Sequence, residues 1–164
     1  MLKGIIFDMD GVLTNSEPFH YRVWKETLRQ RGVNLEYQVY KACIGSTVGF
    51  LMGLLHEHYG IDAQDSSLVR EMQEMKKKLI KKEGYPPLIP YVKELLQNLS
   101  RAGYQLAVAS SSPLAYIEEV TEHWEIGQYF THLISGESVK NPKPAPDVFL
   151  KAAEKLGVFP EECI

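Results

Sequence analysis

The stretch FDMDGVLTNSEP, residues 7–18, sets the fold of this chain. It follows the apolar run GIIF, so residues 3–8 predict a short buried strand that ends in Asp-Gly turn chemistry. Asp8 and Asp10 stand two residues apart where that strand ends. Two carboxylates held this close need a positive charge between them, which raises the question of what they bind.

The pattern on either side of a proline-rich break predicts two kinds of structure. From Ser16 to about residue 85 the spacing of apolar residues is helical, with predicted helices near residues 17–31, 48–59 and 68–83 and no convincing strand. Tyr85-Pro86-Pro87 is a stiff break. After it, helices alternate with the predicted strands 104–110 and 131–136, which is typical of an α/β domain with a parallel sheet. We therefore expect an α/β core of residues 1–15 and 88–164, with a helical domain of residues 16–87 inserted after the first strand.

The composition argues against a nucleic-acid-binding protein, a membrane-surface protein and a disulfide-rich secreted protein. The 164 residues carry a formal charge of −3, with 45% hydrophobic and 24% charged residues. That balance is typical of a globular protein and favours neither nucleic acid nor an anionic membrane as partner. Two cysteines form no disulfide framework, and the N-terminus has no secretory signal, so we expect a cytoplasmic protein.

Three predicted strands end in residues suited to phosphate chemistry. Asp8 and Asp10 follow the first strand, Ser110 and Ser111 follow the second, and the loop KNPKPAPD after the third contains Lys143. Ligands of open parallel sheets bind beyond the carboxyl ends of the strands, so these side chains should meet. Two acids can share a hard cation such as Mg²⁺, while a hydroxyl and a lysine suit phosphoryl oxygens.

Each motif has a simpler interpretation when it is taken alone. The Asp-Gly pair can merely make a turn, Ser110 can cap the next helix, and Lys143 can be a solvated surface lysine. Their occurrence at three successive strand ends favours a phosphoryl-transfer site instead.

The motifs FDMDGVLTNSEP, AVASSSP and KNPKPAPDVF resemble, in order and spacing, the first three motifs of the haloacid dehalogenase superfamily. The resemblance extends over essentially the whole chain and implies a Rossmann-like α/β core. It implies that Asp8 is the nucleophile that becomes an aspartyl-phosphate and that Asp10 is the general acid and base. The Asp8 carboxylate and the Asp10 carbonyl would ligate Mg²⁺, and Ser110, Ser111 and Lys143 would bind the phosphoryl group.

The helical insert looks like the small cap of the branch that contains β-phosphoglucomutases and sugar-phosphate phosphatases. In that branch His20 matches a hinge histidine, and Gly45-Ser46-Thr47 looks like a substrate-specificity loop. A partly buried helix histidine explains His20 equally well.

The chain departs from the family at its C-terminal end, PEECI, where the strand before the fourth motif should begin. The acids of that motif, which complete the Mg²⁺ site, are not among these residues. Glu161 and Glu162 precede the expected strand and would lie at its wrong end. We expect a fragment that lacks at least one βα unit, with GIIF left as an open apolar edge. A chain complete as given would bind Mg²⁺ weakly, have little activity and associate through that edge; otherwise we expect a monomer or a weak homo-oligomer.

The leading hypothesis is a Mg²⁺-dependent phosphatase that acts on a small phosphorylated metabolite, most simply a sugar phosphate. A β-phosphoglucomutase would need the same two aspartates and differs in passing the phosphoryl group to a sugar hydroxyl. Haloacid dehalogenation is a weaker hypothesis, because it leaves Asp10 without a role. A non-catalytic binding protein on a degenerate fold is the alternative from a different class.

Overall fold

A computed structural model describes all of residues 1–164, which form two compact units. The first, here the sheet unit, comprises Met1–Asn15 and Pro87–Ile164. The second, the helical unit, is the continuous segment Ser16–Pro86. The chain thus leaves the sheet unit after its first strand and returns to it after the inserted helices.

The sheet unit is built on three parallel strands, which confirms the predicted α/β class. These are β1 (Gly4–Phe7), β2 (Gln105–Ser110) and β3 (His132–Ser135), in the order β1-β2-β3. In the register, Phe7 pairs with Val108 and Ser110 pairs with Ser135. Since all three strands run the same way, their carboxyl ends lie at one edge of the sheet.

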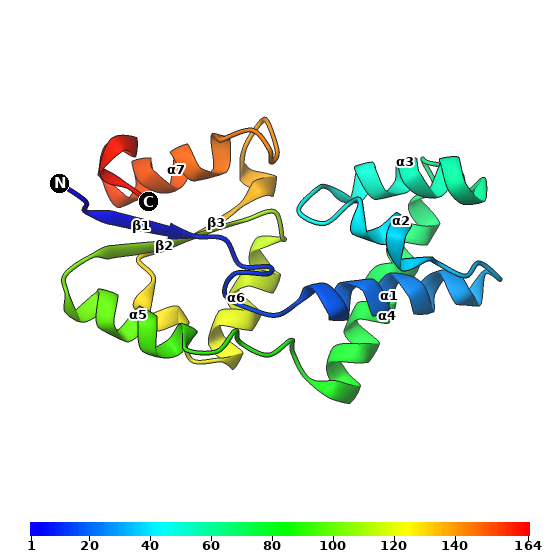
Figure 1. Cartoon of the computed structure of the whole chain (residues 1–164), viewed down its shortest axis with the longest axis horizontal. Coiled ribbons are helices and arrows are strands. Elements are labelled where there is room, and N and C mark those ends of the chain that lie inside the picture. The colour runs from blue at the N-terminus through cyan, green and yellow to red at the C-terminus, as the bar shows by residue number, and fades with distance from the viewer. The chain divides into compact units, whose positions relative to one another are not determined.

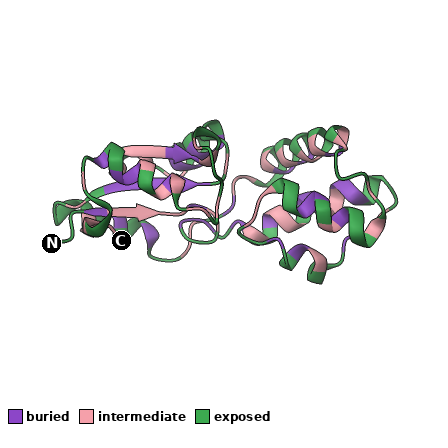
Figure 2. Ribbon diagram, turned by 90° about the horizontal axis from the view of Figure 1, so that it is seen from above, coloured by how far each residue is buried: buried purple, intermediate pink, exposed green.

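Helices cover both faces of this sheet (Figure 1). α7 (Asp147–Leu156) lies on one face, and α5 (Val92–Arg101) and α6 (Leu114–His123) lie on the other. The short 3₁₀ helices η1 (Gly127–Tyr129), η2 (Gly136–Ser138) and η3 (Pro160–Glu162) connect the longer elements. Figure 2 shows the strands buried or half-buried and the outer helix faces exposed. This two-sided cover explains why β2, of sequence QLAVAS, is buried from Leu106 to Ser110.

The outer edge of β1 is partly paired, which corrects the expectation of an open edge. Cys163 forms a parallel bridge with Gly4. The Ile6 amide donates to the Ile164 carbonyl at 2.8 Å, and the Ile164 amide donates to the Gly4 carbonyl at 3.2 Å. The η3 turn places these last residues in extended form alongside β1.

The helical unit contains α1 (Glu17–Gln30), α2 (Tyr37–Lys41), α3 (Val48–Tyr59) and α4 (Ser66–Glu83). Three of these match the predicted helices, and the five-residue α2 is additional. A single turn has too few residues to show a helical period, so the pattern did not reveal it. None of the helices is both long and apolar enough to cross a membrane.

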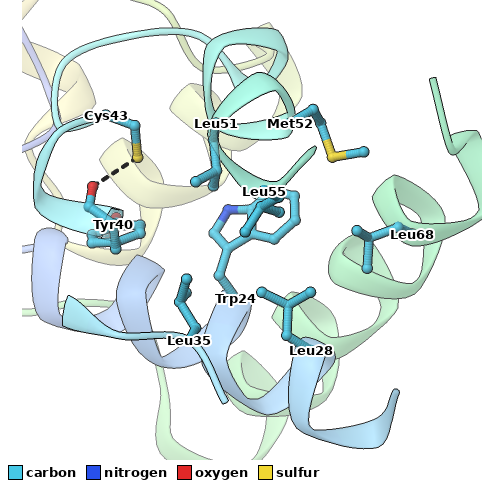
Figure 3. Close-up of a cluster of buried hydrophobic side chains, with 9 residues drawn as sticks. All are labelled: Trp24, Leu28, Leu35, Tyr40, Cys43, Leu51, Met52, Leu55 and Leu68. Atoms are coloured by element: carbon cyan, nitrogen blue, oxygen red, sulfur yellow. Dashed lines mark hydrogen bonds between the residues drawn. The ribbon is translucent and has the colours of Figure 1, made fainter. Parts of the chain in front are cut away.

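Trp24 lies at the centre of the helical unit's main core (Figure 3). Leu28, Leu55 and Leu68 surround it and are fully buried. In the same cluster the Cys43 thiol donates to the Tyr40 carbonyl, with an Sγ···O distance of 2.8 Å. Burial raises the pKa of this thiol to about 11, so it stays protonated and serves as packing.

Local side chains fix where the helices of this unit begin. Thr47 caps α3 by accepting the Phe50 amide at 3.3 Å, and Asp65 caps α4 by accepting the amides of Ser67 and Leu68. Ser16 occupies the corresponding position before α1, but its side chain makes no capping hydrogen bond.

Candidate active site

Asp8 directly follows β1 and forms the centre of a small polar cluster. Its Oδ1 accepts the amide of Met9 at 2.7 Å. Its Oδ2 lies 2.8 Å from the Lys143 Nζ, and the Asp8 side chain is 35% exposed. The carboxylate is therefore held by two donors while one side remains open to solvent.

Lys143 is anchored, and the interpretation of this residue as a solvated surface lysine does not fit. Only 12% of its side chain is exposed. Besides Asp8, its Nζ donates to the Ala109 carbonyl at 3.0 Å and lies 4.7 Å from the centre of the Phe149 ring. The ring face attracts the cation and shields it from water, which fixes the position of the charge.

The loop that carries Lys143 is tied to the start of α7. Asp147 Oδ2 accepts both the Asn141 amide at 3.2 Å and its side-chain Nδ2 at 2.9 Å. The Ala145 amide donates to the Pro142 carbonyl at 3.0 Å, closing a turn around the lysine. Lys140, in the same loop, is exposed.

Asp10 lies in a turn that its neighbour Gly11 makes possible. Gly11 has a φ of 77°, which a residue with a Cβ adopts at a cost. The Gly11 amide donates to the Thr14 carbonyl at 2.9 Å, so the Asp-Gly pair does make a turn. The same turn directs Asp10 toward the end of β2, where its Oδ2 accepts the Ser112 hydroxyl at 2.9 Å.

Ser110 ends β2 and is fully buried. Its hydroxyl oxygen accepts the Ser112 amide at 3.0 Å, a bond that does not use the hydroxyl hydrogen. Ser110 does not cap α6, since Pro113 occupies that position. Ser111 is exposed, and Gly136 packs so near that a Cβ there would lie 3.3 Å from the Ser111 Cα.

Sequence reasoning overlooked Ser112 and Ser135. The Ser135 hydroxyl, at the end of β3, donates to the Ser112 carbonyl at 2.8 Å. The run of three serines at the end of a predicted strand indicated a polar site, but the pattern could not show that the third serine contacts Asp10.

The three cap candidates lie in the helical unit. His20 is half-buried on α1, and its ring lies edge-on to Phe19 with 5.9 Å between ring centres. Gly45 has a φ of 78°, and the Ser46 hydroxyl donates to the Cys43 carbonyl at 2.5 Å. The Ser46 hydroxyl therefore stabilises its own loop, and contact of these residues with a substrate stays a prediction.

The donor set at the strand ends suits a hard divalent cation. It offers the carboxylate of Asp8 and the main-chain carbonyl of Asp10, and Mg²⁺ commonly binds through one or two carboxylates while it keeps water and phosphate ligands. The chain contains no group of three or more His, Cys, Asp or Glu side chains placed to hold a metal. Two carboxylates with one lysine leave this edge with a local charge of −1, which a cation would offset.

Two similar proteins with described activities are phosphatases. The family model for haloacid dehalogenase-like hydrolases matches residues 5–164. The chain is 32% identical to a fructose-1-phosphate phosphatase of Escherichia coli K12, over 98% of this chain and 84% of the relative. It is 27% identical to a phosphorylated carbohydrates phosphatase of Thermotoga maritima, over 99% of this chain and 74% of the relative.

Solved structures show the same fold. The protein CbbY of Rhodobacter sphaeroides, bound to xylulose-1,5-bisphosphate, has a TM-score of 0.83 at 26% identity, covering 100% of this chain and 76% of that one. A β-phosphoglucomutase of Clostridium difficile has a TM-score of 0.84 at 24% identity, covering 99% of this chain and 74% of that one. With a family model that matches nearly the whole length, the chain belongs to the haloacid dehalogenase-like hydrolases.

Proposed function

We propose that this protein is a Mg²⁺-dependent phosphatase that hydrolyses a sugar phosphate through an aspartyl-phosphate on Asp8. The observation that carries the proposal is the contact of 2.8 Å between the Asp8 Oδ2 and the Lys143 Nζ, next to a second aspartate at the same strand end. A part-buried, anchored cation beside a part-exposed carboxylate is an arrangement that suits an incoming phosphoryl group.

Asp8 attacks the phosphorus, and the bond from phosphorus to the sugar oxygen breaks. Asp10 gives a proton to that oxygen, so the sugar leaves as a neutral alcohol. Asp10 then takes a proton from a water molecule, which attacks the aspartyl-phosphate and releases inorganic phosphate. Asp10 donates one proton in the first step and regains one from water in the second, so it ends the cycle protonated as it began.

Lys143 and Ser110 stabilise the negative charge that spreads over the phosphoryl oxygens. Lys143 is already positioned by Ala109 and Phe149, so little rearrangement is needed when charge develops. Ser111, exposed at the same edge, offers a further hydroxyl.

Asp8 and Asp10 would hold the metal ion. Members of this family generally use a divalent metal. When bound, Mg²⁺ would neutralise charge on the phosphoryl oxygens and on the nucleophile. The oxygen donors of this chain fit Mg²⁺ in type.

A phosphorylated sugar is supported as substrate by the relatives. A fructose-1-phosphate phosphatase and a phosphorylated carbohydrates phosphatase are both similar over nearly all of this chain. CbbY, at 26% identity, is bound to a sugar bisphosphate. We infer that the helical unit, with His20, Gly45 and Ser46, forms a cap that selects among such substrates.

The test is a turnover assay with Mg²⁺ and a panel of sugar phosphates that includes fructose 1-phosphate and β-glucose 1-phosphate. We expect release of inorganic phosphate, and we expect Asp8→Asn to abolish it while the circular dichroism spectrum is unchanged. Isomerisation of glucose 1-phosphate without phosphate release would assign a mutase instead. Normal activity of Asp8→Asn would refute the assigned nucleophile.

A further inference from the structure

We propose that Ser112 is a positioning residue for the reaction: its hydroxyl holds the Asp10 carboxylate in the orientation for proton transfer. This inference rests on the proposed function, because it assigns a task to the general acid of that mechanism. Family resemblance assigned the end of β2 to phosphate binding through Ser110 and Ser111, and Ser112 was outside that assignment.

The contact joins distant parts of the chain. The Ser112 Oγ donates to the Asp10 Oδ2 at 2.9 Å, although 102 residues separate them. Asp10 lies in the turn after β1, and Ser112 lies in the turn after β2. The bond therefore connects two neighbouring strand ends through side chains alone.

Ser112 can serve as a fixed point because both of its backbone groups are bonded. Its amide donates to the Ser110 hydroxyl at 3.0 Å, and its carbonyl accepts the Ser135 hydroxyl at 2.8 Å. Ser135 in turn accepts the Glu137 amide at 3.1 Å. With Ser110 fully buried and Ser135 4% exposed, these bonds are protected from water.

A hydroxyl has one hydrogen to donate. In this arrangement the Ser112 hydrogen goes to Asp10, whereas the Ser110 oxygen only accepts and keeps its hydrogen for the substrate. The geometry thus divides the two serines between orienting the acid and binding the phosphoryl group.

In the step that forms the aspartyl-phosphate, the orientation of the acid matters only for substrates whose leaving oxygen needs a proton. An alkoxide of a sugar is a poor leaving group, while p-nitrophenolate leaves without protonation. The ratio kcat/KM reports the steps up to formation of the aspartyl-phosphate, where that difference acts. The effect of removing the Ser112 hydroxyl should therefore depend on the leaving group.

The experiment compares Ser112→Ala, Ser112→Thr and the control Ser138→Ala on fructose 1-phosphate and on p-nitrophenyl phosphate. Near the same edge, the Ser138 hydroxyl donates to the Ser135 carbonyl at 2.6 Å. The Ser138 carbonyl accepts the Lys151 Nζ at 2.7 Å, and Ser138→Ala keeps that bond. We expect Ser112→Ala to lower kcat/KM about 10- to 30-fold for the sugar phosphate and less than about threefold for the nitrophenyl ester. Ser112→Thr should return the sugar-phosphate value to within about threefold, and Ser138→Ala should change neither.

A second comparison uses Asp10→Asn. If Ser112 acts through Asp10, Ser112→Ala should cause no further loss in an Asp10→Asn background. Equal losses on both substrates, or additive losses in the double variant, would refute the positioning role while the phosphatase assignment stands. If no substrate is turned over in an Asp8-dependent way, the proposed function itself fails, and the role of Ser112 fails with it.

Discussion

Replacement of Lys143 by methionine tests the centre of the proposed site. Methionine keeps an unbranched, apolar side chain beside the Phe149 ring but removes the positive charge. The Lys143 Nζ lies 2.8 Å from the Asp8 Oδ2. At that distance, with an effective dielectric constant of about 20, two unit charges attract by roughly 6 kcal/mol before desolvation is subtracted.

The catalytic loss should be smaller than that gross attraction, because the charge is already partly compensated in the ground state. Removal of one preorganised donor to a developing charge typically lowers kcat by about 10²- to 10³-fold, which equals roughly 2.7–4 kcal/mol. We expect Lys143→Met to lower kcat/KM for fructose 1-phosphate within that range.

Folding should be affected much less than activity. The folded protein loses a charge-assisted hydrogen bond worth about 1.5–3 kcal/mol, but the cost of burying an ammonium group disappears with it. A shift of about 2–4 °C in melting temperature accompanies each kcal/mol in a chain of this size. We therefore expect a decrease of only a few degrees by differential scanning calorimetry.

Lys140→Met is the matched control, because Lys140 lies in the same loop, carries the same charge and is exposed. It should leave kcat/KM within about twofold of the parent value, as expected for a screened surface charge. Retention of more than a third of the activity by Lys143→Met would contradict the reasoning. An equal loss in both variants would show that only the overall charge of the loop matters.

Three further predictions concern stability and the close packing at the strand ends. Leu55→Ala should lower the free energy of unfolding by about 3–5 kcal/mol in urea titrations, because Leu55 is fully buried, and a loss below 1 kcal/mol would contradict that. The Ser67 hydroxyl and the Arg31 guanidinium hold the pKa of Asp65 well below its usual range, so its contribution to stability is present above pH about 4 and lost on acidification. Melting temperatures measured between pH about 5 and 2.5 should fall less steeply for Asp65→Asn, and an equal slope would refute this. Gly136→Ala would place a Cβ 3.3 Å from the backbone after β2, so we expect kcat/KM about tenfold lower with folding retained, whereas unchanged kinetics would show that this backbone yields.

The sequence predicted the elements with a clear period, and its contiguous motifs indicated the residues of the candidate site. Val48–Tyr59 matches its predicted bounds, because it has an apolar stripe and a terminal glycine. The short α2 was missed because one helical turn leaves no period. The pairing of Cys163 and Ile164 with β1 was missed because a two-residue extended segment has no pattern of its own.

Contacts between distant motifs were beyond the reach of the sequence. The motifs indicated Asp8 and Lys143 separately, while their distance and the aromatic ring beneath the lysine depend on the packed loop. Likewise, the hydrogen bond from Ser112 to Asp10 depends on how far β1 and β2 are shifted along one another. The register of the sheet sets that shift, and the sequence motifs do not contain it.

The point at which the chain leaves and re-enters the sheet unit has a consequence for how such proteins diversify. The Asn15 amide donates to the Pro87 carbonyl at 2.8 Å, and the Ile89 amide donates to the Leu13 carbonyl at 3.0 Å. These two hydrogen bonds join the segment before the insert to the segment after it. For the sheet unit, the insert is therefore a loop whose two ends are already held together. Because the entropy of closing a loop grows only slowly with its length, an insert of another size or fold could replace this one at little cost to the stability of the sheet unit. If the helical unit selects the substrate as proposed, substrate preference could change in evolution while the sheet unit that carries the candidate site stays the same.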